Sequence, residues 1–220
     1  FFYSLSSNFN NIKNHYEDIF ILSGALLFSF ILFFSIGQIS FLNILSSVIS
    51  SISNSGISSY NPPDNFYLLF IFFTIIGGSL ISNSNGIKFI RIYILFKSTI
   101  LELFKLVTPN IIIDQKILNT RYKINNENLS SSFLIFICFF ISIFILSCIL
   151  VAGGLNFENS FKLSILTITN TVNSSLYGVN EINFSNLLTS SKLAIILFMV
   201  IGKIELLSLF LIIKKIFNKN

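Results

Sequence analysis

Long, nearly uninterrupted apolar runs constrain this chain more than any other feature of its sequence. Residues 19–36 and 133–151 are two such runs, each close to the length of about 20 residues that carries a helix across a bilayer. Charged residues make up 10 % of the chain and hydrophobic residues 53 %, whereas a soluble domain carries about 25 % charge. The chain is therefore predicted to be an all-α integral membrane protein.

Two further spans are predicted, one over residues 66–76 that resumes over residues 87–107, and one over residues 193–217. Two apolar stretches, at residues 41–52 and 160–169, are too short to cross a bilayer, and an irregular polar segment follows each. We expect both to be re-entrant half-helices, which enter the bilayer and turn back. The expected fold is then four transmembrane helices and two half-helices in two similar repeats.

The same pattern sets the expected domain boundaries. Residues 1–17 form a polar lead-in, residues 18–108 the first repeat and residues 132–218 the second repeat. Residues 109–131 form a polar linker between the repeats. Because the chain starts without Met, we also expect its beginning to be truncated.

Small and polar residues interrupt the second span of the first repeat. Gly77 and Gly78 are followed by a polar stretch that includes Ser82, Asn83 and Gly86. Irregular backbone is tolerated at membrane depth where it is buried in protein or lines a watery cavity. We therefore expect a broken helix with a gate or hinge at these five residues, with close helix contacts as the alternative reading of the glycines.

Each half-helix is followed by residue types that suit cation binding. The C-terminus of a helix carries partial negative charge, and small hydroxyl or amide residues allow extended backbone to offer its carbonyl oxygens to an ion. Clusters of Ser, Asn and Gly are also ordinary turns, so the two readings stay open at this point. The predicted ion-filter residues are Ser53, Asn54, Ser55 and Gly56 after the first half-helix, and Asn170, Thr171, Val172, Asn173 and Ser174 after the second.

The basic residues predict the orientation of the chain in the membrane. Seven of its 14 Lys and Arg residues lie between residues 88 and 123. Because cytoplasmic loops collect Lys and Arg, we expect a multi-pass protein of the cell (inner or plasma) membrane with both termini in the cytoplasm. The basic residues flank apolar spans and form no patch with aromatic residues, so a nucleic-acid partner is not expected.

The spans contain few residues suited to other chemistry. The chain has one His, and its two cysteines, Cys138 and Cys148, lie within an apolar run. An enzyme, a metal centre and a bound cofactor are therefore not expected. Lys203 and Glu205 in the last span are the exception: an intramembrane charge costs about 2.5–3.5 kcal/mol on insertion scales, which favours a pore-side role over a local ion pair.

Several short motifs occur in a fixed order along the chain. The pair Gly-Gly at 77–78 precedes GIKFIR at 86–91, the pair Glu-Leu at 102–103 precedes TPN at 108–110, and IGKIE stands at 201–205. This series resembles the C-terminal half, repeats three and four, of the potassium-translocating membrane subunit of Trk/Ktr-type uptake systems. The resemblance covers nearly the full length of the chain.

The resemblance implies a helix–pore helix–helix arrangement in each repeat and transport of a monovalent cation, K⁺ or alternatively Na⁺. It also implies a cytoplasmic nucleotide-binding regulatory subunit as a partner, beside the lipid bilayer. Because repeats one and two are missing, a homodimer or a split-pore partner carrying them is expected. A truncated or degenerate, non-conducting remnant is the alternative function, since Asn173 stands where the family has a filter glycine.

Overall fold

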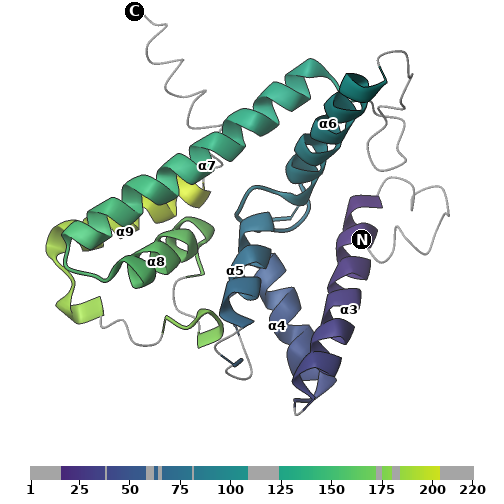
Figure 1. Ribbon diagram of the computed structural model, residues 1–220. Helices are drawn as coiled ribbons and strands as arrows, with labels where there is room; N and C mark the ends of the chain where they lie inside the picture. Colours follow the sequence, from purple (N-terminus) through teal and green to yellow (C-terminus); the bar gives the residue numbers. More distant parts are fainter. Residues whose placement is uncertain are drawn as a thin grey trace, which may run out of the picture.

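The computed structural model describes residues 16–37, 39–57, 62–63, 66–80, 82–108, 124–171, 175–179 and 184–203. The prediction of an all-α fold is confirmed for these residues, which form helices and no strand (Figure 1). The helices are α3 (Tyr16–Ile36), α4 (Phe41–Ser53), α5 (Tyr67–Ile76), α6 (Phe89–Val107), α7 (Asn126–Ala152), α8 (Phe157–Thr169) and α9 (Thr189–Lys203), with short 3-10 turns η2 (Ser175–Tyr177) and η3 (Phe184–Asn186).

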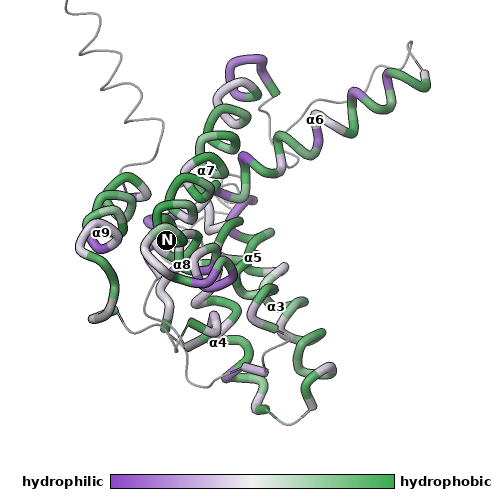
Figure 2. The backbone as a smooth tube through the Cα atoms, turned by 60° about the vertical axis from the view of Figure 1, so that its left-hand side comes forward, coloured by the Kyte–Doolittle hydropathy of each residue, from purple (hydrophilic) through white to green (hydrophobic). Residues whose placement is uncertain are grey.

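Two of the described helices, α3 and α7, are long and apolar enough to cross a membrane. In their most apolar stretches, 17 % of the residues of α3 and 33 % of those of α7 are buried. Many large hydrophobic side chains on both helices are therefore exposed, and Figure 2 colours much of the backbone of both helices green for hydrophobic residues. Such a surface is unfavourable in water and suits contact with lipid.

The other two expected spans take a different form in the structure. The second is divided into α5 and α6, and α6 carries Arg91, Lys97, Glu102 and Lys105 along its length. The last is described as α9, which begins at Thr189 rather than residue 193, and residues 204–217 of that expected span lie outside the described residues. The length and composition of α5, α6 and α9 alone therefore do not identify them as spans.

The short helices α4 and α8 end in the same way. Each has 13 residues, and the next residue adopts the left-handed conformation, Asn54 with φ 56° and ψ 31° and Asn170 with φ 58° and ψ 36°. Asn reaches this conformation more readily than most residues. In both, the following N–H closes the helix end, from Ser55 to the carbonyl of Ser50 (3.1 Å) and from Thr171 to the carbonyl of Leu166 (2.8 Å).

Helix α8 lies at the centre of the described structure. All seven residues from 163 to 169 are buried, and the helix packs against α5, α7 and α9 (Figure 1). Ser164, Thr167 and Thr169 bond within the helix through their hydroxyl groups, for example Thr167 Oγ1 to the carbonyl of Leu163 at 2.7 Å. Because these three buried donors are satisfied, this part of α8 can be polar and still occupy the core. Ser160 Oγ is buried without a hydrogen-bond partner among the described residues.

The break between α5 and α6 is a folded loop, the 77–88 loop, of which residue 81 is not described. The loop returns to the end of α5, because the N–H of Ile87 donates to the carbonyl of Ile75 at 3.0 Å. The N–H of Phe89 donates to the carbonyl of Gly78 at 3.2 Å. The loop therefore sits against the C-terminus of α5 and starts α6 beside it.

The expected boundary between the linker and the second repeat differs from the structure. Residues 126–131 were expected in the linker and form the first turns of α7. Asn125 precedes the helix with extended backbone, and Glu127 lies in the first turn, where a negative charge stabilises the helix dipole. Residues 1–15, 109–123 and 204–218 of the expected domains lie outside the described residues.

Candidate functional site

The first predicted filter segment follows α4. Ser53 is the last helical residue, and Gly56 has φ +69°, a conformation that favours glycine. Ser55 Oγ lies 2.9 Å from Ser50 Oγ, so its hydroxyl stays at the helix end. Asn54 is 9 % exposed and its side chain points away from α4, toward the 77–88 loop.

The second predicted filter segment follows α8. Asn170 Nδ2 donates to the carbonyl of Met199 in α9 at 3.2 Å. Thr171 is 3 % exposed, and its Oγ1 lies 2.9 Å from Thr169 Oγ1. The remaining predicted residues of this segment, Val172, Asn173 and Ser174, lie outside the described residues.

One residue of the 77–88 loop links the ends of both short helices. Asn54 Nδ2 donates to the carbonyl of Asn85 at 2.7 Å, and Asn85 Nδ2 donates to the carbonyl of Thr169 at 3.1 Å. Both hydrogen bonds are buried. Asn54 Oδ1 is buried beside them without a hydrogen-bond partner among the described residues. The C-termini of α4 and α8 therefore lie on either side of Asn85, with one free acceptor oxygen.

Glycines at both ends of the loop allow this close approach. Gly77 has φ +68° and Gly86 has φ +92°. A Cβ at Gly77 would overlap the carbonyl oxygen of Asn85, and a Cβ at Gly86 would lie 2.8 Å from the carbonyl oxygen of Thr74. These two of the three predicted hinge glycines are thus required by the packed position of the loop.

Hydroxyl groups hold the middle of the loop. The N–H of Gly78 donates to Ser84 Oγ at 2.9 Å, and Ser82 Oγ lies 2.6 Å from Ser84 Oγ. A Cβ at Gly78 would lie 2.6 Å from Ser82 Oγ. Asn83 is exposed at the tip between them. The structure therefore brings together all five predicted gate residues in one compact loop.

Two lysines present positive charge to the loop. Lys88 is 3 % exposed, and its Nζ donates to the carbonyls of Ser82, at 2.7 Å, and Ser84. Lys203 Nζ lies 3.5 Å from the carbonyl oxygen of Asn83. The loop, Gly202 and Lys203 enclose a cavity of about 180 Å³ between them.

The charges predicted in the last span lie at the edge of the described residues. Lys203 is exposed at the last described residue of α9, and its Nζ faces the loop. Glu205, its predicted neighbour, lies outside the described residues, so the pore-side role of the two charges stays a prediction.

Asn85 and Lys88 were not predicted as site residues. The sequence could have identified Lys88, because a charge beside an apolar helix at membrane depth indicates a functional or fully bonded group. No feature of the sequence distinguishes Asn85, since it follows Asn83 and Ser84 in a stretch of similar small polar residues.

The chemistry available here is that of oxygen ligands and positive charge. The carbonyls at the C-termini of α4 and α8 and Asn54 Oδ1 are acceptors that suit a desolvated alkali cation. No group of three His, Cys, Asp or Glu that could hold a metal ion occurs in the described part of the chain. The Asn85 amide occupies one of these acceptors, the carbonyl of Thr169, whereas the Lys88 ammonium bonds to the loop carbonyls of Ser82 and Ser84.

Comparison with solved structures identifies the fold. The chain is similar to the crystal structure of the potassium transporter TrkH from Vibrio parahaemolyticus, with a TM-score of 0.75 and 22 % sequence identity, over 88 % of this chain and 42 % of that chain. No protein-family model and no curated protein matches the chain.

The described residues therefore have an all-α fold of the TrkH type. At 22 % identity the likeness concerns the fold. The chain spans less than half the length of the TrkH structure.

Proposed function

We propose that this chain is the ion-translocating part of a membrane protein that moves a monovalent cation, K⁺, in the manner of a Trk/Ktr-type uptake system. The observation that carries the proposal is the meeting of two short-helix C-termini at Asn85, through buried hydrogen bonds to Asn54 and Thr169. The likeness in fold to a potassium transporter supports the choice of ion.

The ion path in this proposal runs between the C-termini of α4 and α8, the two pore helices. Both helix dipoles place partial negative charge there, and the Thr169 carbonyl and Asn54 Oδ1 add oxygen ligands in a buried setting. The predicted filter residues after each helix would line the same path and replace the hydration shell of the ion.

The 77–88 loop is the gate of this path. The Asn85 amide occupies the Thr169 carbonyl that a cation would use. Lys88 and Lys203 add positive charge on the same side of the loop as the 180 Å³ cavity, which opposes entry of a cation. The described arrangement is then the closed state, and Gly77, Gly78 and Gly86 are the hinge positions.

The membrane setting follows from the same proposal. The apolar outer surfaces of α3 and α7 contact lipid, and the chain is multi-pass in the cell membrane with both termini cytoplasmic. Its two repeats, each helix–pore helix–helix, supply half of a four-part ring. A second copy of the chain, or a separate chain with the other two repeats, completes the ring.

Two further expectations belong to this proposal. A cytoplasmic nucleotide-binding subunit regulates the transporter. In this proposal the chain carries out no enzymatic reaction and holds no cofactor, because its task is to bind and release an ion.

Uptake of K⁺ by a potassium-deficient host tests the proposal. We expect expression of the protein to restore growth at low K⁺, and Gly56→Ala to reduce uptake at least about tenfold, because a side chain at φ +69° strains the segment after the first pore helix. Gly24→Ala is the matched control, since a Cβ at Gly24 meets nothing within 4 Å.

Both variants are compared at equal amounts of protein in the membrane. Normal uptake by Gly24→Ala with loss in Gly56→Ala supports the filter assignment. Equal uptake by both variants contradicts it. An absence of uptake by the unaltered protein, both alone and together with a chain that carries the other two repeats, indicates the non-conducting remnant instead.

A further inference from the structure

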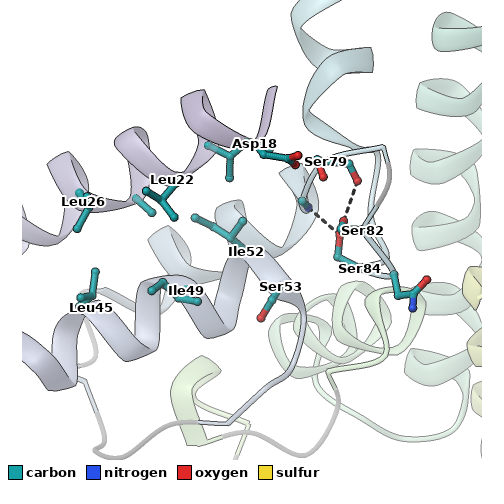
Figure 3. Close-up of a pocket in the computed structure, with 14 residues that line it drawn as sticks. Asp18, Leu22, Leu26, Leu45, Ile49, Ile52, Ser53, Ser79, Ser82 and Ser84 are labelled. Atoms are coloured by element: carbon teal, nitrogen blue, oxygen red, sulfur yellow. Dashed lines mark hydrogen bonds between the residues drawn. The ribbon is translucent and has the colours of Figure 1, made fainter. Parts of the chain in front are cut away.

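The start of α3 contacts the 77–88 loop through a carboxylate. Glu17 is half-buried, and its Oε1 accepts a hydrogen bond from the N–H of Leu80 at 3.2 Å, which joins residues 63 positions apart. Figure 3 shows this region, with Asp18 of α3 beside Ser79 of the loop. One helix is therefore bonded directly to the segment that we assign to the gate.

The same carboxylate closes the start of α6. Lys88, the residue before this helix, has φ +75° and makes no capping hydrogen bond with its side chain. The first N–H groups of a helix have no acceptor within it. Here the N–H of Phe89 donates to the carbonyl of Gly78, and the N–H of Ile90 donates to the Glu17 carboxylate. Glu17 thus takes the place of an N-cap side chain, where the helix dipole stabilises its negative charge.

The two donors stand at opposite ends of the loop. Leu80 lies near its beginning and Ile90 just after its end, so one carboxylate holds both ends against α3. Beside this contact the rings of Phe20 and Phe89 lie with their centroids 5.4 Å apart, and α3 itself packs against α4. A movement of the loop that carries Leu80 away from α3 must therefore break the bond to Glu17.

Two other charges lie near Glu17. Lys88 attracts its carboxylate and Asp18 repels it. Both have further interactions, among them the bonds from Lys88 Nζ to the carbonyls of Ser82 and Ser84. The contribution of Glu17 to the loop therefore rests on the backbone N–H groups that it accepts. A hydrogen bond to a charged group is about twice as strong as one between neutral groups.

We propose that Glu17 is a positioning residue of the gate, which holds the 77–88 loop in its closed position by accepting the N–H groups of Leu80 and Ile90. Glu17 contacts the ends of the loop rather than the proposed ion path between α4 and α8, so it acts through the loop. This role rests on the proposed function of the loop as a gate, whereas the effect of Glu17 on the position of the loop does not.

The rate at which a thiol reagent labels a buried residue of the loop measures how often the loop opens. Ser79→Cys supplies the thiol, in a chain whose two cysteines are replaced by Ala. Ser79 is 7 % exposed, and its carbonyl accepts the hydrogen bonds from Ser82, so the change of its side chain leaves them in place. The reagent is N-ethylmaleimide, and labelling is followed at constant neutral pH, well below the Tm of each variant.

We expect Glu17→Gln to raise the labelling rate about threefold, because the amide still offers one acceptor oxygen but no charge. Glu17→Ala offers no acceptor and should raise the rate about tenfold. Glu102→Gln is the matched control and should leave the rate unchanged, since Glu102 lies far along α6 and pairs there with Lys105 at 2.7 Å. A rate for Glu17→Ala equal to that for Glu102→Gln overturns the proposal.

Uptake kinetics separate this role from the proposed function. In the chain with its own Ser79 and cysteines, we expect Glu17→Ala to raise the maximal rate of K⁺ uptake about tenfold when opening limits uptake, and to leave the KM for K⁺ unchanged. A changed KM would show that Glu17 acts on the ion itself, and overturns its assignment as a positioning residue.

The remaining outcomes distinguish the two proposals. Faster labelling of the Glu17 variants with an unchanged maximal rate of uptake contradicts the loop as the gate. Faster labelling with no uptake by any variant, alone or together with a chain that carries the other two repeats, contradicts ion transport and leaves the effect of Glu17 on the loop intact. Unchanged labelling with normal uptake overturns the role of Glu17 and leaves ion transport intact.

Discussion

Asn85 accepts one hydrogen bond through its backbone carbonyl and donates another through its side-chain amide, and both bonds are buried. A buried hydrogen bond between neutral groups contributes about 0.5–1.5 kcal/mol, and leaving one partner unsatisfied costs about 1–3 kcal/mol. The side-chain bond to Thr169 alone can therefore bias the loop toward its closed position by an order of magnitude or so, since about 1.4 kcal/mol corresponds to tenfold.

Replacement of Asn85 by Ala is expected to raise K⁺ uptake. The variant keeps the backbone carbonyl that Asn54 uses and loses the donor to Thr169, so the loop leaves the path more often. The expected increase is about three- to tenfold when opening limits uptake. Initial rates of uptake into cells or vesicles measure it.

Asn128→Ala serves as the control for this variant, because Asn128 is exposed in the first turns of α7 and lies outside the proposed gate and path. Its uptake should match that of the unaltered protein. A rate for Asn85→Ala at or below that of Asn128→Ala would show that the amide does not hold the loop closed.

We expect the positive charge of Lys203, rather than the size of its side chain, to affect ion uptake. Lys203→Gln is expected to raise uptake about threefold, because a positive charge beside a narrow path repels a cation and screening by water and salt keeps the effect modest at an exposed site. Lys203→Arg keeps the charge and should retain the original rate.

Lys192→Gln is the control for Lys203→Gln. Lys192 lies at the other end of α9, and its Nζ donates to the carbonyl of Ser185 at 2.9 Å. No change in uptake is expected there. Similar effects of Lys192→Gln and Lys203→Gln would indicate a general response to surface charge.

At the scale of helices, the close approach of α8 and α9 fixes the second half of the site. A Cβ at Gly202 would overlap the carbonyl oxygen of Ile168, one residue before the end of α8. Because backbone meets backbone there, no side-chain rotation relieves the overlap. The position of Lys203 beside the loop depends on this contact.

Gly202→Ala is therefore expected to push α9 away from α8. Overpacking of this kind costs about 1–3 kcal/mol, which corresponds to a fall in Tm of about 2–12 °C for a chain of this size. Thermal unfolding in detergent micelles measures the change. Gly24→Ala, with free space around the added Cβ, should leave the Tm unchanged or slightly higher, and an equal Tm for both variants would contradict the contact.

Helices were the part of this structure most open to prediction, because hydrophobic runs and breaks are local signals. The stretch 41–52 predicted α4 to within one residue, and Gly77 and Gly78 mark the end of α5. The start of α7 at Asn126 was missed, because its first turns are polar and resemble a linker. The hydrogen bond from Asn85 to Thr169 could not be predicted, since it joins residues 84 positions apart through three-dimensional packing.

At the scale of the whole molecule, the described helices form two groups that meet at the loop (Figure 1). Helices α3 and α4 pack together, as do α7, α8 and α9, and α5 contacts both α4 and α8. Each group contains one short helix, and α6 packs against α7 as well as α3, so the arrangement in two repeats stays a prediction. The ion path proposed here lies where the two groups meet, rather than within either.

Anomalous scattering from Tl⁺, an ion of nearly the size of K⁺, tests the central claim most directly. In crystals of the protein grown with Tl⁺, we expect a bound ion between the C-termini of α4 and α8, within coordination distance of Asn54 Oδ1 or of the carbonyls that follow each helix. Ordered α4 and α8 with Tl⁺ bound only elsewhere, or with no Tl⁺ at all, would contradict an ion path between the two helices.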